Sequence, residues 1–269
     1  MARKLFSAFI ICGLFILECT RTLSAEENFL LINGDTNEIV VELGPHIDER
    51  VTPACSFNIA LSLMGFDAGI LKDEEIPIWN FQEGYDDFLE SWKASQTPHS
   101  WMTRSCVWYS KIIGLQLGLE TIQNYLALLE YGNQDMSTGL ATPGGSTKAA
   151  WISASLTISP REQVDFIQKM IHGKFSVSSN AIQMTKGLVF KEELPEGWKL
   201  YGKTGLGTIV SQDGPNLQVR WFVGWIENDH AFFPFAYQMR EKEINVGLAV
   251  PRVKQLLVES QVMSRGWHD

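Results

Sequence analysis

The order of apolar patterns along this chain constrains its fold more than any single motif. Two β-rich runs, at residues 29–33 and 39–42, flank turn residues near the N-terminus and predict a hairpin. Three further strand-like runs lie near the C-terminus, at residues 208–210, 219–225 and 231–239. The stretch between them is helical in pattern. We therefore predict an α+β fold, in which an antiparallel sheet built from both chain ends is flanked by helices and interrupted by an inserted all-helical region.

The predicted helices lie mainly in the middle of the chain. Residues 57–64 form an apolar helical stretch, and residues 101–129 suggest two helices broken near Gly118. Another helix is expected to begin at Ser159-Pro160, with Ser as N-cap and Pro in the first turn. A final helix is expected from Pro251. Because no repeat or Pro/Ser-rich linker separates these segments, we predict a single domain.

Residues 1–25 have the pattern of a secretory signal peptide. A short basic stretch precedes the apolar run from Leu5 to Leu17, and small residues near Ser24 and Ala25 end it. We therefore predict export to the bacterial periplasm or secretion, with the mature domain spanning residues 26–269. An uncleaved anchor is the alternative, and a lipoprotein signal around Cys19 is less consistent with the preceding Glu18.

The charge and cysteine content exclude several classes of function. Acidic residues outnumber basic ones, 31 to 22, which argues against nucleic acid as a partner. After cleavage only Cys55 and Cys106 would remain, too few for a disulfide scaffold. The five histidines show no metal-ligand spacing, so we expect no metal site.

Two short motifs carry groups suited to acyl-transfer chemistry. Lys203-Thr204-Gly205, predicted at the start of a strand, offers a cation, a hydroxyl and a backbone edge without a side chain. Together these can hold a substrate carboxylate and let an amide lie along the strand. Ser105, two residues before Val107 near a helix start, can pass a proton to a leaving nitrogen. Each motif alone is weak evidence.

In combination, the order and spacing of the motifs resemble the class D (oxacillinase-type) β-lactamases. The resemblance extends from about Phe29 to the terminal helix, and it includes four stretches, at residues 59–67, 105–110, 131–135 and 201–205. It implies β-lactam antibiotics or peptidoglycan-like ligands as partners, no metal, and a monomer or homodimer.

The family's nucleophile motif, Ser-x-x-Lys, is altered in this sequence. An ungapped alignment places Cys55 at the nucleophile position and Asn58 at the position of the lysine, which the family carboxylates and uses as general base. An Asn amide neither titrates nor forms a carbamate, so it cannot take a proton from water. A thiol at a helix N-terminus near Lys203 can ionise and attack. We therefore expect slow acylation at Cys55 and a long-lived adduct.

Three alternatives concern the same motif. A one-residue shift would make Ser56 the working hydroxyl, although it requires a gap at the helix start. A disulfide between Cys55 and Cys106 would remove the thiol altogether. Asn58 can also be a hydrogen-bonded polar residue that only fills the lysine cavity.

The resemblance assigns two further residues near the site. Trp151 would form a wall of the site, with a place in the core as the alternative. The family's carboxylate-binding Arg is replaced by Val250, so Arg252 is the candidate substitute, with a solvent-exposed position as the alternative.

Two functions are consistent with these features. The first is a class D β-lactamase that hydrolyses penicillin-type amides through an acyl-enzyme, with turnover weakened or lost. The second is a non-catalytic penicillin-binding pseudoenzyme or sensor, which binds or traps β-lactams or cell-wall peptides.

Overall fold

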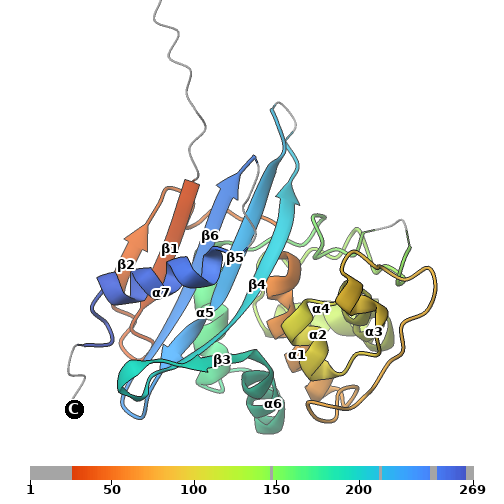
Figure 1. Cartoon of the computed structure of the whole chain (residues 1–269), viewed down its shortest axis with the longest axis horizontal. Coiled ribbons are helices and arrows are strands. Elements are labelled where there is room, and N and C mark those ends of the chain that lie inside the picture. Colours follow the sequence, from red (N-terminus) through yellow and green to blue (C-terminus); the bar gives the residue numbers. More distant parts are fainter. Residues whose placement is uncertain (1–25, 146–147, 212–213, 243–246, 265–269) are drawn as a thin grey trace, which may run out of the picture.

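A six-stranded antiparallel sheet, built from both ends of the chain, organises the molecule (Figure 1). The computed structural model describes residues 26–145, 148–211, 214–242 and 247–264. The strand order is β2-β1-β6-β5-β4-β3. The strands are β1 (Glu26–Ile32), β2 (Ile39–Leu43), β3 (Phe190–Glu193), β4 (Lys199–Ile209), β5 (Leu217–Glu227) and β6 (Phe232–Glu241). Because β1 pairs with β6, the predicted α+β fold with a sheet from both chain ends is confirmed.

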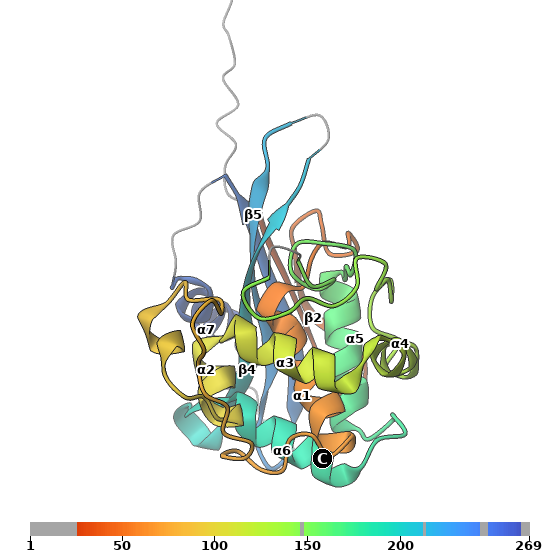
Figure 2. The ribbon, with the colours of Figure 1, turned by 90° about the vertical axis from the view of Figure 1, so that its right-hand side faces the viewer.

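Helices cover both faces of this sheet (Figures 1 and 2). On one face, α7 (Ala249–Glu259) packs Val253 and Leu257 against a cluster that includes Phe222 of β5. On the other face, α5 (Pro160–Ile171) contributes Val164 and Ile167 to the larger core, which also holds Trp221. Successive β5 side chains thus point to opposite cores, since side chains alternate along a strand.

The inserted helical region surrounds one central helix. Residues 58–66 of α1 (Asn58–Asp67) are all buried. Against it pack α3 (Val107–Leu117) and α6 (Ser179–Val189), while α2 (Pro98–Arg104) packs on both of these helices and α4 (Leu119–Leu128) packs on α3. Gly118 separates α3 from α4 at a φ of 81°, which glycine adopts without strain, so the predicted break is confirmed.

The sequence prediction differs from the structure in several places, among them the absence of α6 and β3 from the prediction and the start of α7 at Ala249, two residues before the predicted Pro251. The segment before Gly118 contains two helices, because Ser105 ends α2 in a left-handed conformation. The Lys203-Thr204-Gly205 motif lies inside β4, which is longer than predicted. A short 3-10 helix, Ala54–Phe57, precedes α1. The predicted start at Ser159 is confirmed, with a capping box to Glu162.

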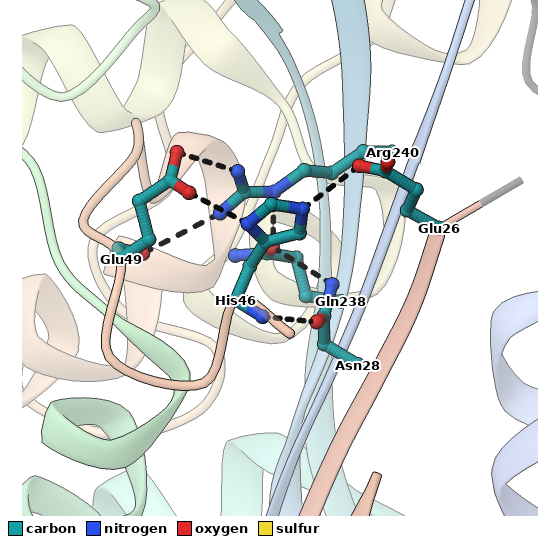
Figure 3. Close-up of polar contacts among 6 residues, drawn as sticks. All are labelled: Glu26, Asn28, His46, Glu49, Gln238 and Arg240. Carbon is teal, nitrogen blue, oxygen red and sulfur yellow. Dashed lines mark hydrogen bonds and ion pairs between the residues drawn. The ribbon is translucent and has the colours of Figure 1, made fainter. Parts of the chain in front are cut away.

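A polar network fastens the first described strand to β6 (Figure 3). His46 bonds Glu26 at 2.8 Å and Glu49 at 2.6 Å, and the Glu49 carboxylate also accepts from Arg240 at 2.6 Å. Gln238 accepts from the Arg240 side chain at 2.6 Å. These bonds hold β1 in the sheet from its first residue.

No helix in the described part of the chain is long and apolar enough to cross a membrane.

Candidate active site

A cleft of about 400 Å³ lies where β4 meets the turn before α1, the turn between α2 and α3, and the start of α7. Five of the residues predicted from the sequence to act in catalysis or substrate binding line this cleft together: Cys55, Ser105, Val107, Thr204 and Gly205. The remaining described lining is largely apolar and comprises Phe88, Leu89, Trp92, Arg104, Leu206, Arg220, Gly247, Ala249 and Val250. Segments distant in sequence therefore meet at one site.

Cys55 lies on a sharp turn that brings its side chain into the cleft. Ala54 before it has a φ of 48°, an unusual conformation for a residue with a side chain. Strand β4 approaches this turn closely at Gly205, where a Cβ atom would lie 2.8 Å from the Pro53 carbonyl oxygen and 3.3 Å from the Cys55 nitrogen. Only glycine permits this approach, which places the Cys55 backbone N–H beside the strand.

Ser56 is turned away from the cleft and into the protein. It is buried, and its hydroxyl donates to the Pro53 carbonyl at 2.7 Å and accepts from Gln163 Nε2 at 3.0 Å. Both bonds stabilise the turn of residues 53–57, which is called the nucleophile turn below. Of the two adjacent candidates, the geometry therefore favours Cys55 over Ser56 as the attacking residue.

Lys203 and Ser105 form a buried polar pair beside Cys55. The Lys203 ammonium donates to the Ser105 hydroxyl and, at 2.9 Å, to the Thr204 carbonyl oxygen. Burial lowers the pKa of Lys203 to about 8, although the nearby Cys55 opposes this shift. A substantial fraction of Lys203 is therefore neutral near physiological pH and can accept a proton through Ser105.

Both cysteines are free thiols in the structure. Burial raises the pKa of Cys55, and the charge of Lys203 offsets only part of this effect. The expectation that Cys55 ionises without a base is therefore wrong, because desolvation outweighs the neighbouring cation. Burial raises the pKa of Cys106 to about 12, so that thiol is inert.

Asn58 is buried directly after the nucleophile turn. Its Oδ1 accepts from the Ser110 hydroxyl at 3.2 Å, and Ser110 in turn accepts from Trp101 Nε1 at 2.8 Å. Asn58 Nδ2 has no hydrogen-bond acceptor among the described residues. With its oxygen occupied, Asn58 presents a donor and has no group that can take up a proton.

Trp151 contributes to the core around this position and does not border the cleft. It is buried, and its ring centroid lies 5.3 Å from that of Phe57. Trp151 therefore supports the residue before Asn58 from the protein interior.

The structure does not support Arg252 as a substrate ligand. Its guanidinium forms two bonds to Glu27, at 2.7 and 2.8 Å, and it is not among the residues lining the cleft. Val250 does line the cleft, and so do two arginines that the sequence analysis missed, Arg104 at the end of α2 and Arg220 of β5. Only the pairing of Arg220 with Leu206 across β4 and β5 places it there, and no sequence motif could have indicated this.

No cluster of three or more His, Cys, Asp or Glu side chains that could hold a metal occurs in residues 26–264 where the structure describes them. The polar groups that line the cleft include the Cys55 thiol, the hydroxyls of Ser105 and Thr204, and two guanidinium groups, and the Lys203 amine lies beside Ser105.

Comparison with known proteins agrees with this geometry. The family model for the penicillin binding protein transpeptidase domain matches residues 31–257. "Beta-lactamase OXA-1" of Escherichia coli is 38% identical over 199 residues, covering 74% of this chain and 70% of that protein. "Regulatory protein BlaR1" of Bacillus licheniformis is 26% identical over 240 residues, covering 88% of this chain and 37% of that protein.

A solved structure has the same fold and significant sequence identity. The class D β-lactamase OXA-427 superimposes with a TM-score of 0.78 at 34% identity, covering 88% of this chain and 98% of that chain. Members of this family act without a metal cofactor. The fold, the family model and these relatives together show that the chain belongs to the class D serine β-lactamase family.

Proposed function

We propose that this protein recognises penicillin-type β-lactams, is acylated by them at Cys55, and releases the product slowly or not at all. One observation carries the proposal. Cys55 shares a cleft with Ser105, Thr204 and Gly205, while Asn58, which the resemblance aligns with the family's general base, is buried at the start of α1.

The acylation step uses groups that the cleft brings together. The Cys55 proton passes to the Ser105–Lys203 pair, and the sulfur attacks the lactam carbonyl carbon. A carbon–sulfur bond forms, the lactam carbon–nitrogen bond breaks, and Ser105 returns the proton to the leaving nitrogen. Backbone N–H groups of Cys55 and of β4 after Gly205 stabilise the developing oxyanion. The product is a ring-opened thioester.

Release of the acyl group requires a water molecule to lose a proton as it attacks. General-base assistance to such a step is worth roughly 10²–10⁴-fold in rate. Asn58 cannot supply it, because its oxygen accepts from Ser110 and its nitrogen is only a donor. The thioester is therefore expected to persist.

A second candidate is a sensor that binds β-lactams or cell-wall peptides without releasing a product. The likeness to the regulatory protein BlaR1 favours it. Trapping at Cys55 would serve this role as well, whereas a purely non-covalent sensor would form no adduct.

Intact mass spectrometry of residues 26–269 after incubation with benzylpenicillin tests the proposal. We expect a mass increase equal to the whole drug, lost in Cys55→Ala and retained in Cys106→Ala, whose thiol is buried. An unmodified wild-type protein, or an adduct that persists in Cys55→Ala, would remove the proposal. Release at rates typical of enzymes, about 10 s⁻¹, would refute the role given to Asn58.

We further propose that residues 1–25, which lie outside the described residues, are a cleaved signal peptide and that the mature protein is exported. Expression in a Gram-negative host should yield a periplasmic protein whose sequenced N-terminus lies near Glu26. A cytoplasmic or membrane-bound protein that begins at residue 1 would contradict this.

A further inference from the structure

Strand β3, at one edge of the sheet, contains a bulge at Lys191. Phe190 pairs with Tyr201 of β4, whereas Glu192 pairs with Leu200, the preceding residue of that strand. Lys191 is therefore an extra residue with no partner on β4. A bulge bends its strand and redirects side chains, and bulges are common next to active sites.

The bulge turns Phe190 and Glu192 to opposite faces of the sheet. Glu192 accepts from Lys254 of α7 at 2.8 Å. The Phe190 ring packs on Tyr201, which belongs to the core on the other face, with ring centroids 5.5 Å apart. Lys203 shares the face of Tyr201, because alternate residues of a strand point to the same side. The bulge thus brings the beginning of β3 to the face that carries Lys203.

The charge of Lys191 is not balanced by a neighbouring carboxylate. Lys191 is half-buried, burial lowers the pKa of its ammonium, and it makes no hydrogen bond or ion pair to any described residue. Lys186 of α6, the other lysine beside Tyr201, differs in this respect. It forms an ion pair with Glu227 and lies 5.3 Å from the centre of the Tyr201 ring.

Two titratable groups of the described chain act on Lys203 in addition to its burial. Burial lowers the pKa of Lys203 to about 8, the Cys55 thiol opposes this change, and the Lys191 ammonium adds to it. Two positive charges repel each other more strongly in a protein interior than in water. Lys191 therefore favours the neutral amine of Lys203, the form that accepts a proton through Ser105.

We propose that Lys191 is a positioning residue that acts through Lys203: its unbalanced charge keeps the Lys203 amine ready to accept the Cys55 proton at neutral pH. This inference rests on the proposed function and names a group that regulates its first step from outside the cleft. Lys191 is not among the residues that line the cleft, so its effect is electrostatic.

The titration of Lys203 can be followed by NMR in protein labelled with carbon-13 at the lysine ε carbons. The Lys203 signal is assigned from its loss in Lys203→Met. Lys191→Met should move the midpoint of this titration to higher pH, whereas Lys191→Arg, which keeps the charge, should leave it close to that of wild type.

Acylation of Cys55 by benzylpenicillin should change in parallel. Because the neutral fraction of Lys203 falls as its titration moves to higher pH, acylation at pH 7 should slow by about 3- to 10-fold in Lys191→Met and little in Lys191→Arg. The difference should narrow as the pH rises above about 9, which loss of a purely structural contact would not produce.

Lys254→Met is the matched control, because it removes the lysine that binds the neighbouring Glu192 on the opposite face. It should not move the Lys203 midpoint, and thermal unfolding of each variant identifies any loss of folding. An unchanged midpoint in Lys191→Met, or equal changes in Lys191→Met and Lys191→Arg, overturns the inference. The expected change of midpoint together with an unmodified wild-type protein supports the electrostatic role and counts against acylation at Cys55 alone.

Discussion

The side chain at position 58 lies in the interior, with its oxygen held by Ser110 and its nitrogen without an acceptor in the described residues. A lysine there would carry a titratable nitrogen into the same buried place, next to the nucleophile turn. At the scale of single residues, the function proposed above depends on the absence of this one group, which would separate capture of a β-lactam from its release. In the same proposal, Cys55 and Lys203 carry out the first step.

Restoring the family's serine at position 55 and lysine at position 58 tests whether the missing lysine prevents release of the acyl group. In the double variant Cys55→Ser with Asn58→Lys, hydrolysis of a chromogenic cephalosporin should rise by at least about 10²-fold over Cys55→Ser alone, because a general base is regained. Steady-state rates in buffer containing bicarbonate provide the measurement. If the double variant stays inactive, the defect lies elsewhere, for example at Val250.

Acylation at Cys55 should depend on pH in a defined direction. Burial lowers the pKa of Lys203 to about 8, so the neutral amine that accepts the thiol proton becomes dominant above this pH. The acylation rate followed by mass spectrometry should therefore rise from pH 6 to pH 9. In Lys203→Met the rise through pH 8 should disappear, and a flat wild-type profile would contradict the role of Lys203.

At the scale of elements, the site depends on how closely β4 approaches the turn before α1. Gly205 lies against Pro53 and Cys55, and at Gly207 a Cβ atom would lie 2.8 Å from the Thr52 side chain. This contact between strand and turn brings the Lys203 motif and the nucleophile together. Small residues at both positions are therefore a condition for the cleft.

Gly205→Ala should push β4 away from the turn before α1. The added methyl would meet the Pro53 oxygen at 2.8 Å and the Ser56 nitrogen at 2.9 Å, both backbone atoms that cannot rotate away. We expect a loss of about 1–3 kcal/mol in the free energy of unfolding, together with slower acylation at Cys55. Denaturant unfolding measures the first effect.

Gly187→Ala in α6 is the matched control. Apart from the backbone of its own helix and its two chain neighbours, nothing lies within 4 Å of the position of its Cβ, so the change should stabilise the helix by about 0.5–1 kcal/mol and leave acylation unchanged. Equal effects of the two substitutions would argue against a close strand–turn contact.

At the scale of the whole molecule, both chain ends are held in one sheet. The network around His46 holds β1 to β6 (Figure 3), and Arg252 of α7 is bonded to Glu27 of β1. The folded protein also buries groups that are better solvated in water, among them Lys203, which is 1% exposed. Burying this charge lowers the free energy of unfolding.

Lys203→Met should increase stability at neutral pH. The folded-state pKa of Lys203 is lowered from 10.5 to about 8, so the unfolded chain binds more protons between these values. Its destabilising effect is therefore complete below pH 8 and lost as pH rises toward 10.5. It amounts to at most about 3 kcal/mol.

Unfolding free energies of wild type and Lys203→Met measured from pH 6 to pH 9.5 should therefore converge as pH rises. Lys199→Met, on the same strand but exposed, is the control and should show no such convergence. A constant difference across the range would contradict the burial effect.

The amino-acid sequence by itself determined the coarse order of hairpin, helical middle, antiparallel strands and final helix, the break at Gly118, the capped start at Ser159 and the motifs that indicate the family. These features depend on local chemistry. Apolar periodicity, a residue able to adopt positive φ and a capping hydroxyl act within a few positions along the chain. The absence of lysine at position 58 was equally visible, since it concerns residue type alone.

Only the tertiary structure decided which side chains share the cleft. Cys55 faces it and Ser56 does not, because one turn directs adjacent residues to opposite sides. Arg220 enters it through strand register, and Arg252 is withdrawn by an ion pair across the molecule. Burial also reversed the expected ionisation of the thiol. Register, long-range pairing and desolvation arise from packing among distant segments, which no local pattern encodes.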